Sequence, residues 1–244
     1  MKSLNKALEI LELVLGYKGH PITPGDAAKH CGTNASSCVR TIKALVARGY
    51  LIQVSRRSGY ISGPMVFALG DNDCFYSRLT RIAEPVLRRI SPVLHHRVIL
   101  TTAAAGRKFI LRQYEDGGCD TLNSVQNDFY QTTSGRLLLA YFPAAELAAY
   151  IKVNGLPGSA WKGMTTVGQL QEELAAIGTK RYYRMVDEEG NICIAVPVLV
   201  PGQPAAGISS YVRNEEDVET AISVLTGAAA EITAWFRGTA VTAL

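Results

Sequence analysis

The feature that most constrains the fold is a fixed order of local signals near the start of the chain. Apolar residues recur at helical spacing over residues 3–15. Residues 23–26, a hydroxyl, a proline, a glycine and an acid, mark the start of a short second helix. A longer third helix follows, capped by Asn34 or Thr33, and then two β-prone runs around a Gly-containing loop. This order of elements predicts a winged helix-turn-helix.

Charge is unevenly distributed along the chain. Residues 1–70 hold nine Lys and Arg against three Asp and Glu, whereas residues 71–244 hold sixteen against eighteen. A basic winged helix suits a polyanion such as double-stranded DNA, although winged helices also dock proteins. Residues 27–70 contain no acid at all, yet they carry Lys29, Arg40, Lys43, Arg48, Arg56 and Arg57.

In such a module the third helix enters the major groove, and the hairpin tip rests on the backbone or in the minor groove. Short hydroxyls on the exposed side of the helix permit close approach to phosphates, and Arg40 can reach a guanine. The predicted DNA-binding residues are Ser36, Ser37, Arg40, Thr41 and Lys43 on the helix and Arg56 and Arg57 in the hairpin loop.

The remainder of the chain is predicted to form a linker and one mixed domain, so the fold class is α+β. The winged helix-turn-helix is expected over residues 1–63, a linker helix region over 64–76 and the second domain over 77–244. A long helix over residues 75–94 contains Pro85, which must kink it or mark its first turn. The further strand candidates are 97–102, 108–114, 122–126, 180–186, 192–200 and 205–212, and the helix candidates are 135–142, 144–153, 167–177 and 215–236.

Composition and motifs exclude several classes of protein. The longest apolar run, residues 192–200, is about half of the ~20 residues that a membrane-spanning helix needs, so no membrane partner is expected. Five scattered cysteines without a C-x-x-C pair, and the absence of H-E-x-x-H, predict reduced thiols, no metal centre and a cytoplasmic location. The chain lacks G-x-S-x-G, a P-loop and G-x-G-x-x-G, so neither catalytic residues nor a cofactor are expected.

Five segments together resemble the IclR family of transcriptional regulators, and the resemblance covers nearly the whole chain. It implies a winged helix joined by a linker helix to a GAF-like effector-binding domain. It also implies a homodimer or homotetramer on a palindromic DNA operator, with dimerisation through the N-terminal domain and linker. The segments are residues 3–12 (SLNKALEILE), 47–51 (ARGYL), 59–70 (GYISGP leading to ALG), 132–141 (TTSGRLLLAY) and 190–198 (GNICIAVPV).

The resemblance also implies an effector pocket on the sheet of the second domain. Exposed N–H groups at the start of a helix, with hydroxyls beside them, suit a small carboxylate. Alternatively, Thr133 or Ser134 only caps that helix and Cys193 only packs in the core. By position, the implied effector-binding residues are Thr132, Thr133, Ser134, Gly135, Asp187, Cys193, Ser209 and Tyr211.

One departure from the family pattern concerns DNA reading. The family commonly has an arginine where this chain has Thr41, and Arg40 stands one position earlier, a rotation of ~100° about the helix. We therefore expect a different base readout.

The leading hypothesis is a transcriptional regulator, a repressor, whose operator binding is controlled by a small metabolite. The hydroxyl-rich pocket with one tyrosine fits a small organic acid and an aromatic acid equally well. A ligand-binding scaffold that docks protein through its winged helix, and an enzyme built on the C-terminal domain, are the alternatives.

Overall fold

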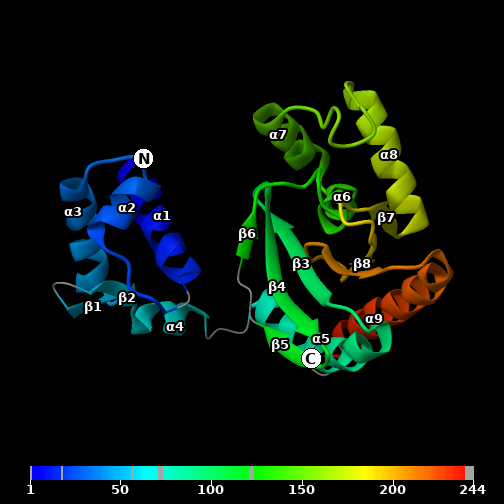
Figure 1. The fold of residues 1–244 in the computed structure, drawn as a ribbon, viewed down its shortest axis with the longest axis horizontal. Helices are drawn as coiled ribbons and strands as arrows, with labels where there is room; N and C mark the ends of the chain where they lie inside the picture. Colours follow the sequence, from blue (N-terminus) through cyan, green and yellow to red (C-terminus); the bar gives the residue numbers. More distant parts are fainter. Residues whose placement is uncertain (1, 18, 56–57, 71–73, 121–123, 240–244) are drawn as a thin grey trace. The chain divides into compact units, whose positions relative to one another are not determined.

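The computed structural model describes residues 2–17, 19–55, 58–70, 74–120 and 124–239. The chain divides into two compact units, Met1–Cys74 and Phe75–Leu244, shown in blue to cyan and in green to red in Figure 1. Each unit has its own hydrophobic core and is described by itself.

The described part of the N-terminal unit contains three helices, a two-stranded hairpin and a short fourth helix. As predicted, Thr23 caps the second helix: its hydroxyl accepts from the Asp26 N–H at 3.2 Å, and the Asp26 carboxylate accepts from the Thr23 N–H at 2.8 Å. Asn34, rather than Thr33, caps the third helix by accepting from the Ser37 N–H at 2.8 Å. The elements are α1 (Lys2–Gly16), α2 (Pro24–His30), α3 (Ala35–Ala47), β1 (Leu51–Ser55), β2 (Gly59–Ser62) and α4 (Pro64–Gly70).

The hairpin is fixed to the rest of this unit through Gly59. Ile22 and Tyr60 exchange backbone hydrogen bonds of 2.9 and 2.8 Å. Gly59 has a φ of +98°, and a Cβ at this position would lie 2.2 Å from the Ile22 carbonyl oxygen. Only glycine permits this approach, so the wing is held against the segment before α2.

Two helices of this unit bury only part of their apolar residues. In α3 the buried residues include Cys38, whereas Val39 is only partly buried. In α1 the buried residues are Ile10 and Val14, and a row of leucines stays outside the core. Leu4, Leu8 and Leu15 are 62%, 49% and 50% exposed. A second apolar face on α1 is therefore left uncovered by its own unit.

The C-terminal unit is a seven-stranded sheet with helices on both faces. All its pairings are antiparallel, and the strand order is β5-β4-β3-β9-β8-β7, with β6 paired to β4. The strands are β3 (Val98–Ala104), β4 (Arg107–Glu115), β5 (Gly118–Asp120), β6 (Ser124–Gln126), β7 (Tyr183–Val186), β8 (Ile192–Val198) and β9 (Ala206–Val212). The helices are α5 (Phe75–Leu94), α6 (Thr133–Leu139), α7 (Ala144–Asn154), α8 (Val167–Lys180) and α9 (Val218–Thr239), the last preceded by the 3-10 turn η1 (Glu215–Asp217).

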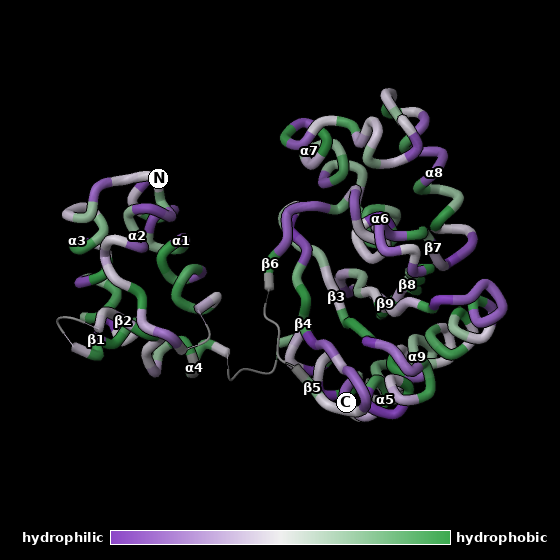
Figure 2. The backbone as a smooth tube through the Cα atoms, in the orientation of Figure 1, coloured by the Kyte–Doolittle hydropathy of each residue, from purple (hydrophilic) through white to green (hydrophobic). Residues whose placement is uncertain are grey.

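Two hydrophobic clusters lie on opposite faces of the sheet. One joins α5 and α9 to strand residues such as Leu100, Ile194 and Ile208. The other joins α6, α7 and α8 to residues such as Ala195, which neighbours Ile194 but points the other way. The green stretches of α5, α8 and α9 in Figure 2 alternate with purple ones, as expected for helices with one face on a core.

Helix α5 has the predicted bounds and continues through Pro85. Other element boundaries differ from those predicted. Helix α8 continues to Lys180, and β7 begins only at Tyr183. Between them Arg181 has a φ of +60°, a left-handed conformation that ends the helix. Within the described ranges, no helix has the length and apolar character needed to cross a membrane.

Candidate functional site

The exposed side of α3 carries the first group of predicted site residues. Ser36, Arg40 and Lys43 are exposed and follow one another at helical spacing, so they lie on one side of the helix. Ser37 and Thr41 are partly buried beside them, and the Thr41 hydroxyl donates to the Ser37 carbonyl at 3.3 Å. The structure therefore brings all five helix residues together on one surface.

Lys6 also belongs to this surface, and the sequence reasoning missed it. Its Nζ donates to the Ser37 Oγ at 2.5 Å, which ties the start of α1 to the start of α3. The only sequence signal was a lysine on the polar side of the first amphipathic helix. The other two predicted residues, Arg56 and Arg57, lie outside the described residues.

The second group surrounds the start of α6. The Thr132 hydroxyl caps this helix by accepting from the Gly135 N–H at 3.2 Å, so the cap is Thr132 rather than Thr133 or Ser134. Thr133 and Ser134 are buried. A Cβ on Gly135 would lie 2.5 Å from the Phe129 carbonyl oxygen, so only glycine allows this turn of α6 to sit so close to the preceding segment.

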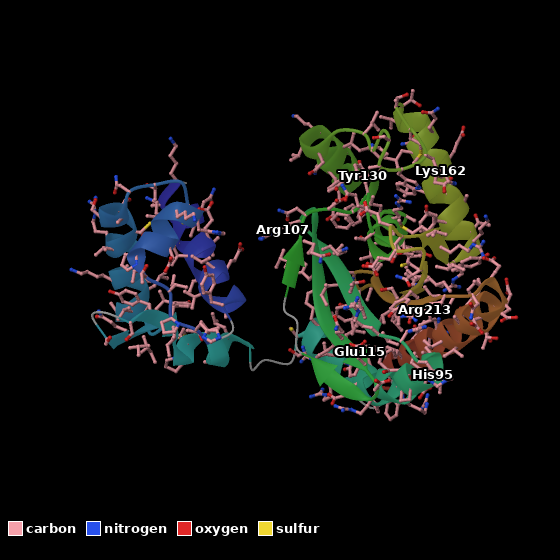
Figure 3. The ribbon with its side chains drawn as sticks, viewed as in Figure 1. His95, Arg107, Glu115, Tyr130, Lys162 and Arg213 are labelled. Carbon is pink, nitrogen blue, oxygen red and sulfur yellow. The ribbon has the colours of Figure 1, made fainter. Side chains whose placement is uncertain are left out.

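A buried arginine fixes α6 to the segments around it. The Arg136 guanidinium donates to the Tyr130 carbonyl at 2.5 Å, the Ala160 carbonyl at 2.6 Å and the Tyr183 hydroxyl at 3.0 Å. It also lies 4.9 Å from the Trp161 ring centroid, in cation–π geometry. Tyr130 is labelled near α7 in Figure 3. The helix that carries Thr133, Ser134 and Gly135 is thus rigidly anchored.

Asp187 and Cys193 meet at the turn between β7 and β8. The Asp187 carboxylate accepts from the Asn191 N–H at 2.9 Å and from the Cys193 thiol at 3.6 Å. Partial burial would raise the pKa of Asp187, but its hydrogen bonds from Asn191 and Cys193 prevail and lower the pKa. Burial, followed by the charge of Asp187, raises the pKa of the Cys193 thiol to about 11, so Cys193 is a neutral thiol at neutral pH.

Ser209 and Tyr211 continue this surface on β9. Tyr211 is paired with Cys193 across the two strands, and Ser209 is paired with Ala195. The Tyr211 ring stacks on His96, with centroids 4.3 Å apart and an interplanar angle of 23°. Because α6 packs against β8 and β9, the predicted effector residues share one face of the sheet. They divide between the start of α6 and the strand ends near Asp187.

Lys108 is a polar residue of this face that the sequence reasoning missed. It stands in β4 opposite Ala103, which packs against the cluster of α6, and its Nζ donates to the Thr132 Oγ1 at 2.6 Å. The alternation of residues in β4 does not by itself show that Lys108 faces α6, because the direction of its side chain depends on how β4 pairs with β3.

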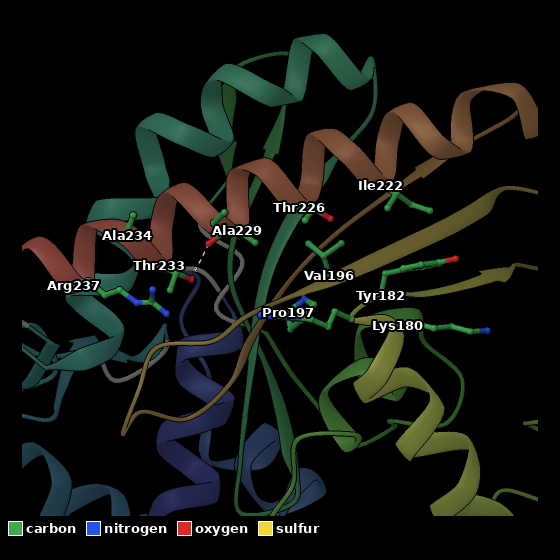
Figure 4. Close-up of a pocket in the computed structure, with 12 residues that line it drawn as sticks. Lys180, Tyr182, Val196, Pro197, Ile222, Thr226, Ala229, Thr233, Ala234 and Arg237 are labelled. Carbon is green, nitrogen blue, oxygen red and sulfur yellow. Dashed lines mark hydrogen bonds between the residues drawn. The ribbon is translucent and has the colours of Figure 1, made fainter.

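A separate cavity of about 580 Å³ lies between α9 and the start of β7. Val196, Pro197 and Ile222 form its apolar part, and Lys180, Arg181 and Arg237 are its charged residues. Figure 4 shows how α9 runs along it, with the Thr233 hydroxyl donating to the Ala229 carbonyl at 2.8 Å. None of the eight predicted effector residues lines this cavity.

A winged helix with a basic third helix, followed by an α/β domain with a polar face, is an arrangement typical of ligand-controlled transcriptional regulators. Residues 77–233 match the sequence model of the bacterial transcriptional regulator IclR C-terminal family. The chain therefore belongs to the IclR family, a family of transcriptional regulators and not of enzymes. The predicted family and fold class are confirmed, with a GAF-like C-terminal domain.

Relatives agree with this assignment. The HTH-type transcriptional regulator BhcR of Paracoccus denitrificans is 27% identical over 218 residues, which cover 86% of this chain and 76% of that protein. Among solved structures, an IclR transcriptional regulator from Alicyclobacillus acidocaldarius has a TM-score of 0.74 and 21% identity, over 97% of this chain and 99% of that chain. An IclR homologue from Microbacterium hydrocarbonoxydans, complexed with 4-hydroxybenzoate, has a TM-score of 0.76 and 20% identity over the same shares.

Proposed function

We propose that this regulator is a cytoplasmic repressor that reads a DNA operator with α3 and releases it when a small organic acid binds its C-terminal unit. The observation that carries the DNA-reading role is the exposed surface of α3, where Arg40 and Lys43 lie beside short hydroxyls in a stretch without any acid. Ser36, Ser37 and Thr41 would contact phosphates, Arg40 would reach a base edge, and Arg56 and Arg57 would contact the backbone.

The uncovered face of α1 supports a homodimer. Leu4, Leu8 and Leu15 form an exposed apolar row that a second copy of α1 can cover. A twofold dimer presents two reading helices and so requires a palindromic operator. The homotetramer is the alternative, as a pair of such dimers.

The buried polar face around α6 supports the effector role of Thr132, Thr133, Ser134, Gly135, Asp187, Cys193, Ser209 and Tyr211. A relative of the same fold is complexed with 4-hydroxybenzoate, which makes an aromatic acid a reasonable effector class here. Release of DNA requires that the effector bind the DNA-free arrangement more tightly than the DNA-bound one.

A gel-shift titration on DNA flanking the encoding gene tests the reading surface. Arg40→Ala should weaken binding by about 10- to 100-fold if the guanidinium contacts a guanine, because such a contact is worth about 1–3 kcal/mol. The double replacement of Arg56 and Arg57 by alanine should flatten the salt dependence, because each lost phosphate contact lowers the slope by about one.

Lys152→Ala is the matched control, since Lys152 is an exposed basic residue on α7 of the other unit. Equal affinity in the wild type, Arg40→Ala and the double variant would refute the assigned surface. Binding to DNA without any salt dependence would instead favour the protein-docking scaffold.

A further inference from the structure

Lys108 is a buried cation. Only 2% of its surface is exposed, although lysine is almost never buried without a partner charge. It stands near the start of β4, where it is paired with Ala103 of β3 on one side and with Gln126 of β6 on the other. Figure 3 labels its neighbour Arg107 at the start of β4, beside β6.

Among the residues that the structure describes, the surroundings of Lys108 supply one hydrogen bond and no ion pair. Its Nζ donates to the Thr132 Oγ1 at 2.6 Å. Among the described residues, no carboxylate lies within 4.0 Å of the ammonium. Asp128 is the acid whose charge acts on it, but this carboxylate accepts from the Tyr130 and Gln131 N–H groups at 2.9 and 3.1 Å.

An ammonium in this setting is costly for the protein. It has three donors, only one of which has a partner among the described side chains and backbone groups, and a buried charge without a counter-charge destabilises the folded state. Burial lowers the pKa of Lys108 to about 8, which leaves most of the side chain charged at neutral pH. A bound anion would relieve this cost.

We propose that Lys108 is the anchor for the carboxylate of the effector, which it binds together with the Thr132 hydroxyl. This inference rests on the proposed function, because it places the carboxylate of the proposed effector on the face of the sheet that packs against α6. Thr132 also caps α6 and precedes Thr133 and Ser134. An anion bound to Lys108 therefore acts directly on the start of the helix that carries the predicted effector residues.

The test compares acids with their uncharged amides. Benzoate and benzamide, 4-hydroxybenzoate and 4-hydroxybenzamide, and pyruvate and pyruvamide are titrated into the full chain by calorimetry. In the wild type we expect at least one acid to bind more tightly than its amide. Lys108→Met should weaken that acid by about 10- to 100-fold, the usual value of a hydrogen bond to a charged group, and leave the amide unchanged.

Two further variants make the assignment specific. Lys152→Met removes an exposed lysine from the same unit and should keep the full preference for the acid. Lys108→Arg keeps the charge and should retain part of the preference, which a role in packing alone does not predict. Lys108→Met should also melt higher than the wild type without ligand, by roughly 2–4 °C, because a buried unpaired charge has been removed.

A wild-type measurement keeps the proposal testable even if Lys108→Met does not fold. The affinity for whichever acid the wild type prefers should fall as the pH rises above about 8, where Lys108 loses its proton. The proposal would be overturned if no acid bound the wild type more tightly than its amide. It would also be overturned if the preference survived Lys108→Met, or if the affinity for the preferred acid did not change with pH. Failure of the wild type to bind operator DNA would remove the proposed function instead.

Discussion

The two faces of the C-terminal sheet are built differently. The face toward α5 and α9 is filled mainly by aliphatic side chains, such as Leu100, Ile194 and Ile208. The face toward α6 carries Lys108, Ser209 and Cys193, together with the buried hydroxyl of Thr133. Both faces belong to the same strands, so the difference comes from alternating residues rather than from separate elements.

The difference separates stability from binding. Burial of aliphatic surface stabilises the folded state by about 25 cal/mol per Å² and requires only that the side chains fit together. The face toward α5 and α9 can therefore be explained by packing alone. Buried polar groups gain little net stability and are costly when unpaired. Their concentration on the α6 face is therefore better explained by a ligand than by the fold.

The largest expected effect contrasts two neighbouring residues of β8. Ile194 is fully buried toward α9, so Ile194→Ala should lower the free energy of unfolding by about 2–5 kcal/mol. Cys193 points to the α6 face and is only partly buried, so Cys193→Ala should cost less than about 1 kcal/mol. Urea unfolding of both variants measures the difference. Equal losses would show that the two faces contribute alike.

Gly135→Ala tests how tightly α6 is held on its face. The added methyl would lie 2.5 Å from the Phe129 carbonyl oxygen and 2.6 Å from the Thr132 Oγ1, so a loss of about 1–3 kcal/mol is expected.

The control for this variant is Gly178→Ala in α8, where nothing lies within 4 Å of the added atom. Alanine should there stabilise the helix by up to about 1 kcal/mol. Thermal unfolding of the two variants should therefore shift in opposite directions, and a shift in the same direction would contradict the close approach at Gly135.

The sequence predicted those features of the fold that depend on interactions between residues close together in the chain. The capping signals at Thr23 and Asn34 act within three residues, and the structure has both caps. The long amphipathic patterns gave most helices, because one apolar face must be buried wherever the helix lies. The left-handed residue that ends α8 is Arg181, and an arginine carries no sequence signal for that conformation.

The features that the sequence did not predict depend on pairing between strands that are distant in the chain. Lys108 is buried because β4 lies between β3 and β6, and the ladder of β3 and β4 shifts register between Leu100 and Thr101. No local pattern specifies such a shift. The leucines of α1 have the spacing of an apolar stripe, but spacing alone does not tell a face buried in the core from an exposed one. The resemblance to the family, rather than spacing, pointed to Cys193 and Ser209.

The pH dependence of stability offers a third comparison, between the wild type and Lys108→Met. Burial lowers the pKa of Lys108 from 10.5 to about 8. Between these values the unfolded chain binds more protons than the folded chain, so stability rises with pH. The wild type should gain up to about 1.4 kcal/mol per pH unit above pH 8 relative to Lys108→Met. Urea unfolding of both proteins at pH 7.5 and 9 measures this gain, and parallel pH profiles would show that Lys108 is not a buried cation.

The smallest expected effect contrasts two adjacent serines of β9. The Ser210 hydroxyl is buried toward α5 and α9 without a hydrogen-bond partner among the described residues, so Ser210→Ala should raise the free energy of unfolding by about 1 kcal/mol. Ser209 points to the α6 face, and Ser209→Ala should change stability little but weaken binding of whichever acid the wild type prefers. Denaturant unfolding with and without that acid separates the two outcomes. If Ser209→Ala left acid binding intact and Ser210→Ala weakened it, the effector would have to lie on the opposite face of the sheet, nearer to α9, and the division between a face for stability and a face for binding would be reversed.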